Sequence, residues 1–237
     1  MTIRGVLIDK DGTLIDCDAT WGPVIRHLAE DLGAAGQADA MVESAGLDLA
    51  TGRLRAGSVF AAGSTRDLVA LWWPDADEAR SLDLARHIDA TCARMGPSTS
   101  APLFALEPFF RELEQRGLAY GIATNDSLVS VRAFLDTKGL SPLVPHVFGY
   151  DSVATPKPGP DMVHAFCAAA GLAPDQVAVV GDNVHDLEMA RAAGAGWAVA
   201  VLTGNGGIGD LEPHADVVLD SIVELPAWID AGCPVIT

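Results

Sequence analysis

Apolar segments of strand length alternate with amphipathic segments of helix length along the chain after residue 103. Compact runs rich in valine, alanine, leucine and isoleucine, bounded by glycine or polar residues, predict strands that are buried on both faces of a sheet. We expect these strands at residues 118–124, 177–181, 197–202 and 215–219, in addition to a first strand at residues 3–8.

The segments between these strands contain the start and stop signals of helices. A polar cap or a proline precedes apolar positions that recur every three or four residues, and a glycine follows them. The strand–helix alternation predicts an α/β fold, a doubly wound parallel sheet with helices on both faces. The expected helices run from Pro108 to Gly117, Ser127 to Gly139, Pro160 to Gly171 and Asn183 to Gly194.

The stretch after the first strand differs, because it shows helical periodicity and no comparable buried strand. We expect an all-helical lobe at residues 16–101, inserted into a core made of residues 1–15 and 102–237. The segment 96–102, Gly-Pro-Ser-Thr-Ser-Ala-Pro, is expected to be a hinge linker between the two lobes. Helical patterns lie at residues 24–32, 38–45, 65–72 and 76–94.

Composition and net charge exclude some classes of binding partner. The 237-residue chain is 49% hydrophobic and has a formal net charge of −17, which repels nucleic acid. No apolar run approaches the roughly 20 residues of a membrane helix, and the start MTIRGVLID lacks the layout of a secretory signal. The four cysteines lack C-x-x-C spacing, which favours reduced structural thiols. We expect a soluble cytoplasmic protein, a monomer or homodimer, whose partner is a small metabolite.

Two aspartates directly follow the first strand. Asp9 and Asp11 share a face of an extended chain, and Gly12 permits a tight turn after them. Ligands of open α/β sheets bind outside the carboxyl ends of the strands, which is where both acids are expected. Adjacent carboxylates repel each other unless a cation or a proton joins them, although a solvated strand end would use the same residues.

Further polar residues fall at later strand ends or in loops beside them. Thr124 and Asn125 follow the second strand, and Lys157 stands between two prolines. Asp182 follows the next buried strand, and Asp186 lies four residues on, a spacing that predicts one face of the following helix. Such an edge suits phosphoryl transfer, because Mg²⁺ prefers oxygen ligands while hydroxyl, amide and lysine donors stabilise the transferred group.

The order of these motifs resembles the haloacid dehalogenase superfamily of aspartate-nucleophile hydrolases. The helical insert resembles the cap of its phosphoglycolate phosphatase-like branch, which implies hydrolysis of phosphoglycolate or a similar small phosphorylated metabolite. The likeness spans the chain outside the insert. Asp9-Lys10-Asp11-Gly12-Thr13 is similar to the first motif of that superfamily, Thr124 to its second, Lys157 to its third, and Gly181-Asp182 with Asp186 to its fourth.

The resemblance implies that Asp9 attacks phosphorus, forms an aspartyl phosphate and binds Mg²⁺. Asp11 would protonate the leaving alcohol and then activate water, and its backbone carbonyl would also bind the metal. The true dehalogenases and the ion-pumping ATPases resemble D-x-Y and D-K-T-G-T at this motif. Asp11 supplies the acid and base that the pumps lack, which favours rapid hydrolysis of the intermediate.

The resemblance also implies roles for the later motifs. Thr124 and the backbone of Asn125 would hold phosphate oxygens, and Lys157 would neutralise both the nucleophile and the phosphate. Asp182 would complete the metal site, while Asp186 would orient a metal-bound water or Lys157. Each of these residues also has a simpler structural alternative, such as a helix cap, a strand end or a surface lysine.

Three alternative functions stay open. A phosphomutase of the β-phosphoglucomutase type shares the first chemical step but needs a cap residue that shuttles protons and a site that excludes water. A signalling receiver domain also gathers acids, threonine and lysine around Mg²⁺, but its phosphorylated aspartate lies at the third strand. A non-catalytic Mg²⁺-binding homologue would keep the fold without turnover.

The insert offers weaker signals. Asp18 and Trp21 follow the first motif and could line the entrance, and a loop with Arg53, Arg55 and Ser58 could place an arginine over a second anionic group of the substrate. A plain surface position is the simpler interpretation for each of these. The pair Trp72-Trp73 is expected in the cap core or at its interface. The histidines show no metal-ligand spacing, and only His185, beside Asp182, is of interest.

Overall fold

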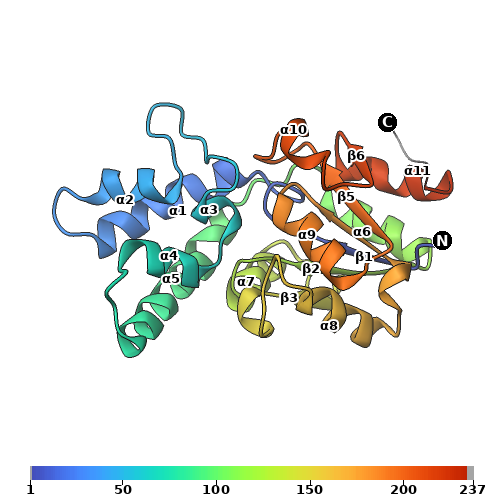
Figure 1. Ribbon diagram of the computed structural model, residues 1–237, viewed down its shortest axis with the longest axis horizontal. Helices are drawn as coiled ribbons and strands as arrows, with labels where there is room; N and C mark the ends of the chain where they lie inside the picture. The colour runs from blue at the N-terminus through green and yellow to red at the C-terminus, as the bar shows by residue number, and fades with distance from the viewer. Residues whose placement is uncertain (1, 234–237) are drawn as a thin grey trace.

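A central parallel sheet organises the larger lobe of the computed structural model, which describes residues 2–233 (Figure 1). Within that range, six strands are ordered β3-β2-β1-β4-β5-β6, and every neighbouring pair is parallel. The expected α/β fold with a doubly wound parallel sheet is confirmed. The strands are β1 (Gly5–Ile8), β2 (Ala119–Ala123), β3 (His146–Phe148), β4 (Val177–Gly181), β5 (Trp197–Val201) and β6 (Val217–Leu219).

Helices cover both faces of this sheet, which explains why its central strands are apolar throughout. Val6 and Ile8 of β1 point into one hydrophobic cluster, while Leu7 between them points into the other, as the two-residue period of a strand requires. The first cluster is covered by α6 (Leu106–Gln115), α7 (Leu128–Thr137) and α11 (Leu225–Asp230). The second is covered by α8 (Asp161–Ala170), α9 (Val184–Ala193) and α10 (Ile208–Leu211).

Several helix ends agree with the capping signals in the sequence. The Ser127 side chain accepts a hydrogen bond from the Ser130 amide before α7, and Asn183 accepts one from the His185 amide before α9. Gly171 ends α8 in the left-handed conformation that glycine adopts without strain. Short 3₁₀ helices lie at η1 (Tyr150–Ser152), η2 (Pro174–Gln176) and η3 (Ile222–Glu224).

The stretch after β1 forms a second, helical lobe beside the sheet, drawn in blue to teal in Figure 1. It has its own hydrophobic cluster, to which the half-buried Trp72 and Trp73 are packed, as expected for a cap core. Their rings meet edge to face at 5.6 Å. Its helices are α1 (Cys17–Leu32), α2 (Ala38–Ala45), α3 (Val59–Ala62), α4 (Thr65–Trp72) and α5 (Glu78–Thr99).

The expected hinge at 96–102 is wrong over its first half, because α5 continues through Gly96 and Pro97 to Thr99. A Cβ at position 96 would lie 3.3 Å from the Trp21 indole, so glycine lets α5 pack closely against α1. The Ser100 amide donates to the Gly96 carbonyl and completes the last turn. Tertiary packing therefore overrides the helix-breaking tendency of the Gly-Pro pair.

None of the helices in residues 2–233 is both long and apolar enough to cross a membrane.

Candidate active site

The strand order places three sequence motifs at one edge of the sheet. The order reverses between β1 and β4, and a crevice forms at such a point outside the carboxyl ends of the strands. Asp9 directly follows β1, Thr124 follows β2, and Asp182 follows β4. The Asp9 amide donates to the Val180 carbonyl at 2.8 Å, so the chain is still fixed to the sheet where the acids begin.

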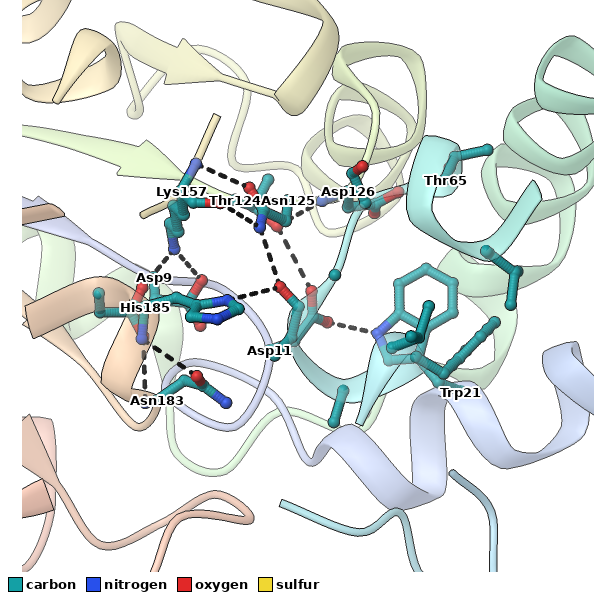
Figure 2. Close-up of a pocket in the computed structure, with 18 of the residues that line it drawn as sticks. Asp9, Asp11, Trp21, Thr65, Thr124, Asn125, Asp126, Lys157, Asn183 and His185 are labelled. Atoms are coloured by element: carbon teal, nitrogen blue, oxygen red, sulfur yellow. Dashed lines mark hydrogen bonds and ion pairs between the residues drawn. The ribbon is translucent and has the colours of Figure 1, made fainter. Parts of the chain in front are cut away.

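Lys157 reaches this edge from the loop before α8. Its ammonium nitrogen lies 2.5 Å from Asp9 Oδ1 and 2.6 Å from Asp186 Oδ1, and the three side chains are buried (Figure 2). The Asn125 side chain fixes the lysine loop, because its Oδ1 accepts from the Lys157 amide and its Nδ2 donates to the Lys157 carbonyl. The side chain of Asn125 thus positions Lys157, a role that the sequence did not suggest.

Asp182 is held by hydrogen bonds from two loops, one after β1 and one after β5. Thr13 donates to its Oδ1 at 3.4 Å, and the Asn205 amide donates to its Oδ2 at 3.2 Å. A Cβ at Gly204 would lie 1.8 Å from Asp182 Oδ2, so the chain can approach the carboxylate only at a glycine. The glycine-rich run Thr-Gly-Asn-Gly-Gly after β5 could have indicated this loop, since a loop that follows a strand of a parallel sheet lies at the carboxyl edge.

The expectation that Asp182 and Asp186 share a helix face is wrong, because Asp182 precedes the helix cap Asn183 and only Asp186 lies within α9. The Asp186 carboxylate faces the edge from the first helical turn, where its Oδ2 accepts from the Asn183 amide at 3.1 Å. Both acids still reach the same place, but from a strand end and a helix start.

The cluster holds more negative charge than its lysine neutralises. Asp9, Asp182 and Asp186 each offer an oxygen within 4.8 Å of the others, and all are buried. Burial raises the pKa of Asp9 to about 7, although the ammonium of Lys157 acts in the opposite direction. Burial, together with the neighbouring Asp9 and Asp186, also raises the pKa of Asp182 well above its usual value. For Lys157, burial lowers the pKa but the two carboxylates outweigh it and raise it.

These residues fit a hard divalent cation. An excess of closely spaced buried carboxylates requires a proton or a positive ion, and carboxylate oxygens are ligands that Mg²⁺ accepts. Lys157 and the Asn183 amide already engage both oxygens of Asp186. Asp9 and Asp182 are therefore better placed to bind the cation, while Asp186 holds the lysine.

Asp11 turns away from the three-acid cluster. Its Oδ1 accepts from the Trp21 indole at 2.5 Å, whereas its Oδ2 faces the Thr124 hydroxyl at 3.5 Å (Figure 2). The same Oδ1 accepts from the Lys10 ammonium at 2.8 Å. Lys10 also lies 3.2 Å from Asp126 Oδ2 and 4.7 Å from the centre of the Trp21 ring. One oxygen of Asp11 is thus held by Lys10 and Trp21, and the other faces Thr124, which lines the cleft.

The helical lobe closes the cleft with α3 and the residues after it. The Ala62 carbonyl accepts from Asn125 Nδ2 at 2.9 Å and lies 3.3 Å from His185 Nδ1, so both core residues contact this lid. Trp21 lines the cleft with the core acids. Asp126 and the α3 segment also line it, and sequence reasoning missed both.

The structure places the other candidates of the insert away from the cleft. Arg53 is 72% exposed and lies 3.4 Å from Asp18, while Arg55 donates to the Glu43 carbonyl. Asp18 accepts hydrogen bonds from the Leu54 amide and from Asn205 Nδ2. Ser58 precedes α3 but is not part of the wall.

Comparisons with known proteins agree with this geometry. A family model described as a haloacid dehalogenase-like hydrolase matches residues 3–194. A phosphoglycolate phosphatase of Xanthomonas campestris pv. campestris (strain 8004) is 32% identical over 98% of this chain and 97% of its own. An N-acetylmuramic acid 6-phosphate phosphatase of Pseudomonas putida is 29% identical over 98% of this chain and 100% of its own. A haloacid dehalogenase-like hydrolase structure from Bacteroides fragilis shares the fold, with a TM-score of 0.76 at 17% identity, covering 94% of this chain and all 100% of that one.

Proposed function

The chain belongs to the haloacid dehalogenase-like hydrolases, and on that premise we propose that it is a phosphatase that attacks a small phosphate monoester with Asp9. One observation supports this most strongly: Asp9 lies at the strand edge between a lysine and a second buried carboxylate, with Asp11 two residues beyond. Two relatives named as phosphatases match nearly the whole chain, which supports the same class of activity.

The proposal assigns a Mg²⁺ ion to Asp9 and Asp182, with the Asp11 backbone carbonyl as a further ligand. Such an ion neutralises the buried carboxylates and the phosphate oxygens, which lets an anionic substrate approach an acidic edge. Lys157, oriented by Asp186, supplies a second positive charge to the transferred group. The Thr124 hydroxyl and the backbone of Asn125 are assigned to the remaining phosphate oxygens.

The chemistry divides between the two aspartates of the first motif. An oxygen of Asp9 forms a bond to phosphorus while the ester P–O bond breaks, and the leaving oxygen takes a proton from Asp11. Asp11 then removes a proton from water, whose oxygen attacks phosphorus and restores the Asp9 carboxylate. The contacts of Asp11 support this role, because Lys10 and Trp21 hold Oδ1 and leave Oδ2 toward the cleft.

Residues 16–101 are assigned to a cap that covers this site, and residues 1–15 and 102–237 to the catalytic core. The contacts of Asn125 and His185 with the Ala62 carbonyl support a closed arrangement, in which the segment after α3 limits the entry of water.

The test is release of inorganic phosphate from a panel of phosphate monoesters, with Mg²⁺ and with EDTA. We expect release with Mg²⁺ and loss of release with EDTA, with the Asp9→Asn variant as the inactive control. Product analysis separates the alternatives, since a phosphomutase would yield an isomeric sugar phosphate. Folded protein that releases no phosphate from any ester would contradict the proposal.

A further inference from the structure

The cleft wall contributed by the helical lobe is chemically unlike the strand edge that it faces. The edge is polar and contains five carboxylates: those of Asp9, Asp11, Asp126, Asp182 and Asp186. The opposite wall consists largely of Trp21, Val59, Phe60, Leu68 and Ile88. A bound ester has its phosphate at the edge, so its alcohol portion must lie against this wall.

The described residues that line the cleft offer no free lysine or arginine for a second anionic group, and His185 Nδ1 lies against the Ala62 carbonyl. Of the described residues that line it, Lys157 is the single lysine or arginine, and it already contacts Asp9 and Asp186. Arg53 and Arg55 of the lobe lie outside the cleft lining, where Arg53 pairs with Asp18 and Arg55 donates to the Glu43 carbonyl. A carboxylate on the alcohol portion would therefore lose water among acids without gaining a cation.

The hydroxyls and the indole N–H of this wall already donate hydrogen bonds within the protein. Ser64 donates its hydroxyl to Asp67 at 2.7 Å, and Thr65 donates its hydroxyl to Asp89 at 2.7 Å. The Trp21 indole donates to Asp11. A polyhydroxylated alcohol would leave hydroxyls without partners here, which costs binding free energy.

An aromatic pair gives the wall its shape. The rings of Trp21 and Phe60 meet edge to face with centroids 6.2 Å apart, and Leu68 and Ile88 are almost completely buried beside the cleft. Aromatic and branched aliphatic surface favours an apolar group that displaces water from it.

We propose that this wall selects phosphate monoesters whose alcohol is uncharged and largely apolar, and that Phe60 is a specificity-determining residue. The inference rests on the proposed phosphatase function. It separates this chain from the relative named as a phosphoglycolate phosphatase, since phosphoglycolate has a carboxylate in place of an apolar group.

The test compares three esters of primary alcohols at saturating Mg²⁺: benzyl phosphate, 2-phosphoglycolate and glucose 6-phosphate. We expect kcat/KM for benzyl phosphate to exceed the other two by about tenfold or more. Equal values, or a preference for 2-phosphoglycolate, would overturn the inference while leaving the phosphatase proposal intact. Absence of phosphate release from any monoester would contradict both.

Two variants test Phe60 itself. Phe60→Ala should raise KM for benzyl phosphate about tenfold with little change in kcat, and leave 2-phosphoglycolate hydrolysis within about twofold. Phe60→Arg should improve 2-phosphoglycolate hydrolysis by supplying the missing cation. The matched control is Leu82→Ala, which removes an apolar side chain of the same lobe that is 50% exposed. Equal losses for all esters in Phe60→Ala would reject a specificity role.

Discussion

Two buried lysines contact the aspartates of the first motif, and their surroundings differ. Lys157 and Lys10 are 6% and 1% exposed, and each contacts two carboxylates: Lys157 those of Asp9 and Asp186, Lys10 those of Asp11 and Asp126. In front, Asp182 adds a third acid to the Lys157 group. Lys10 instead lies against the Trp21 ring, 4.7 Å from its centre.

The ion pairs of Lys157 and Lys10 are similar, but their surroundings suit them to different roles. The Lys157 group has surplus carboxylate oxygens that face the cleft, so it can accept a cation and a phosphate. The Lys10 group is closed by an aromatic ring, and its main effect is to fix one oxygen of Asp11. Burial lowers the pKa of Lys10, but Asp11 and Asp126 outweigh it and raise that pKa, so the lysine stays charged.

The largest effect is expected at Asp9, the proposed nucleophile. Asp9→Asn keeps the shape of the side chain but removes the attacking oxygen, so kcat should fall by about 10⁴-fold or more. Phosphate release measures this, with circular dichroism to verify folding. Activity within tenfold of the wild type would mean that another group attacks phosphorus.

Replacing each lysine in turn tests the contrast between the two groups directly. Lys157→Met and Lys10→Met each leave buried carboxylates without their cation, so both should lose about 3–5 kcal/mol of stability. Activity should separate them, because Lys157 contacts Asp9, the proposed nucleophile, whereas Lys10 contacts Asp11. We expect kcat/KM to fall about 10³-fold for Lys157→Met and about 10–30-fold for Lys10→Met.

Melting temperatures and initial rates below both transitions provide the two measurements. Equal activity losses in the two lysine variants would remove the distinction between a group that binds phosphate and a group that positions an acid.

Cation affinity should depend on pH through the Lys157 group. The pKa of Asp9 is raised to about 7, so below that pH the carboxyl holds a proton that Mg²⁺ must displace. Affinity should therefore weaken by about tenfold from pH 8 to pH 6. Calorimetric titration with MgCl₂ measures this, and equal affinity at the two pH values would contradict the assignment of Asp9 as a ligand.

The smallest effect is expected outside the cleft. Arg53→Ala should leave kcat/KM within about twofold for every substrate, because this arginine is exposed and pairs with Asp18. A large loss on anionic substrates alone would show that the lobe rearranges to bring Arg53 over the site.

Much of the fold could be predicted because strong local signals agreed with the tertiary structure. Apolar runs marked β1, β2, β4 and β5, whereas β3 (His146–Phe148) was missed because three partly buried residues after a proline give little periodicity. The Gly96-Pro97 pair led to the wrong prediction of a hinge, because the packing of Gly96 against Trp21 is a long-range contact that no local pattern reports.

Part of the candidate site could likewise be predicted from the sequence, and part of it could not. Asp9, Thr124 and Asp182 could be placed at one edge because parallel strands end together there, whereas Lys157 reaches that edge from the loop before α8. The second partner of Lys10 could not be predicted, since Asp126 lies more than a hundred residues away in sequence, just before the helix cap Ser127. The residues of the helical lobe that line the cleft could not be predicted either. The sequence around Phe60 and around Arg53 does not show which of these two segments folds over the cleft.

The most direct test of the central claim is to trap the enzyme during turnover with a phosphate monoester, reduce it with borohydride and analyse its peptides by mass spectrometry. We expect homoserine at position 9, which arises only if the Asp9 carboxylate had been joined to phosphorus. Unmodified Asp9 in an enzyme quenched during active turnover, or homoserine at Asp11 instead, would contradict the account.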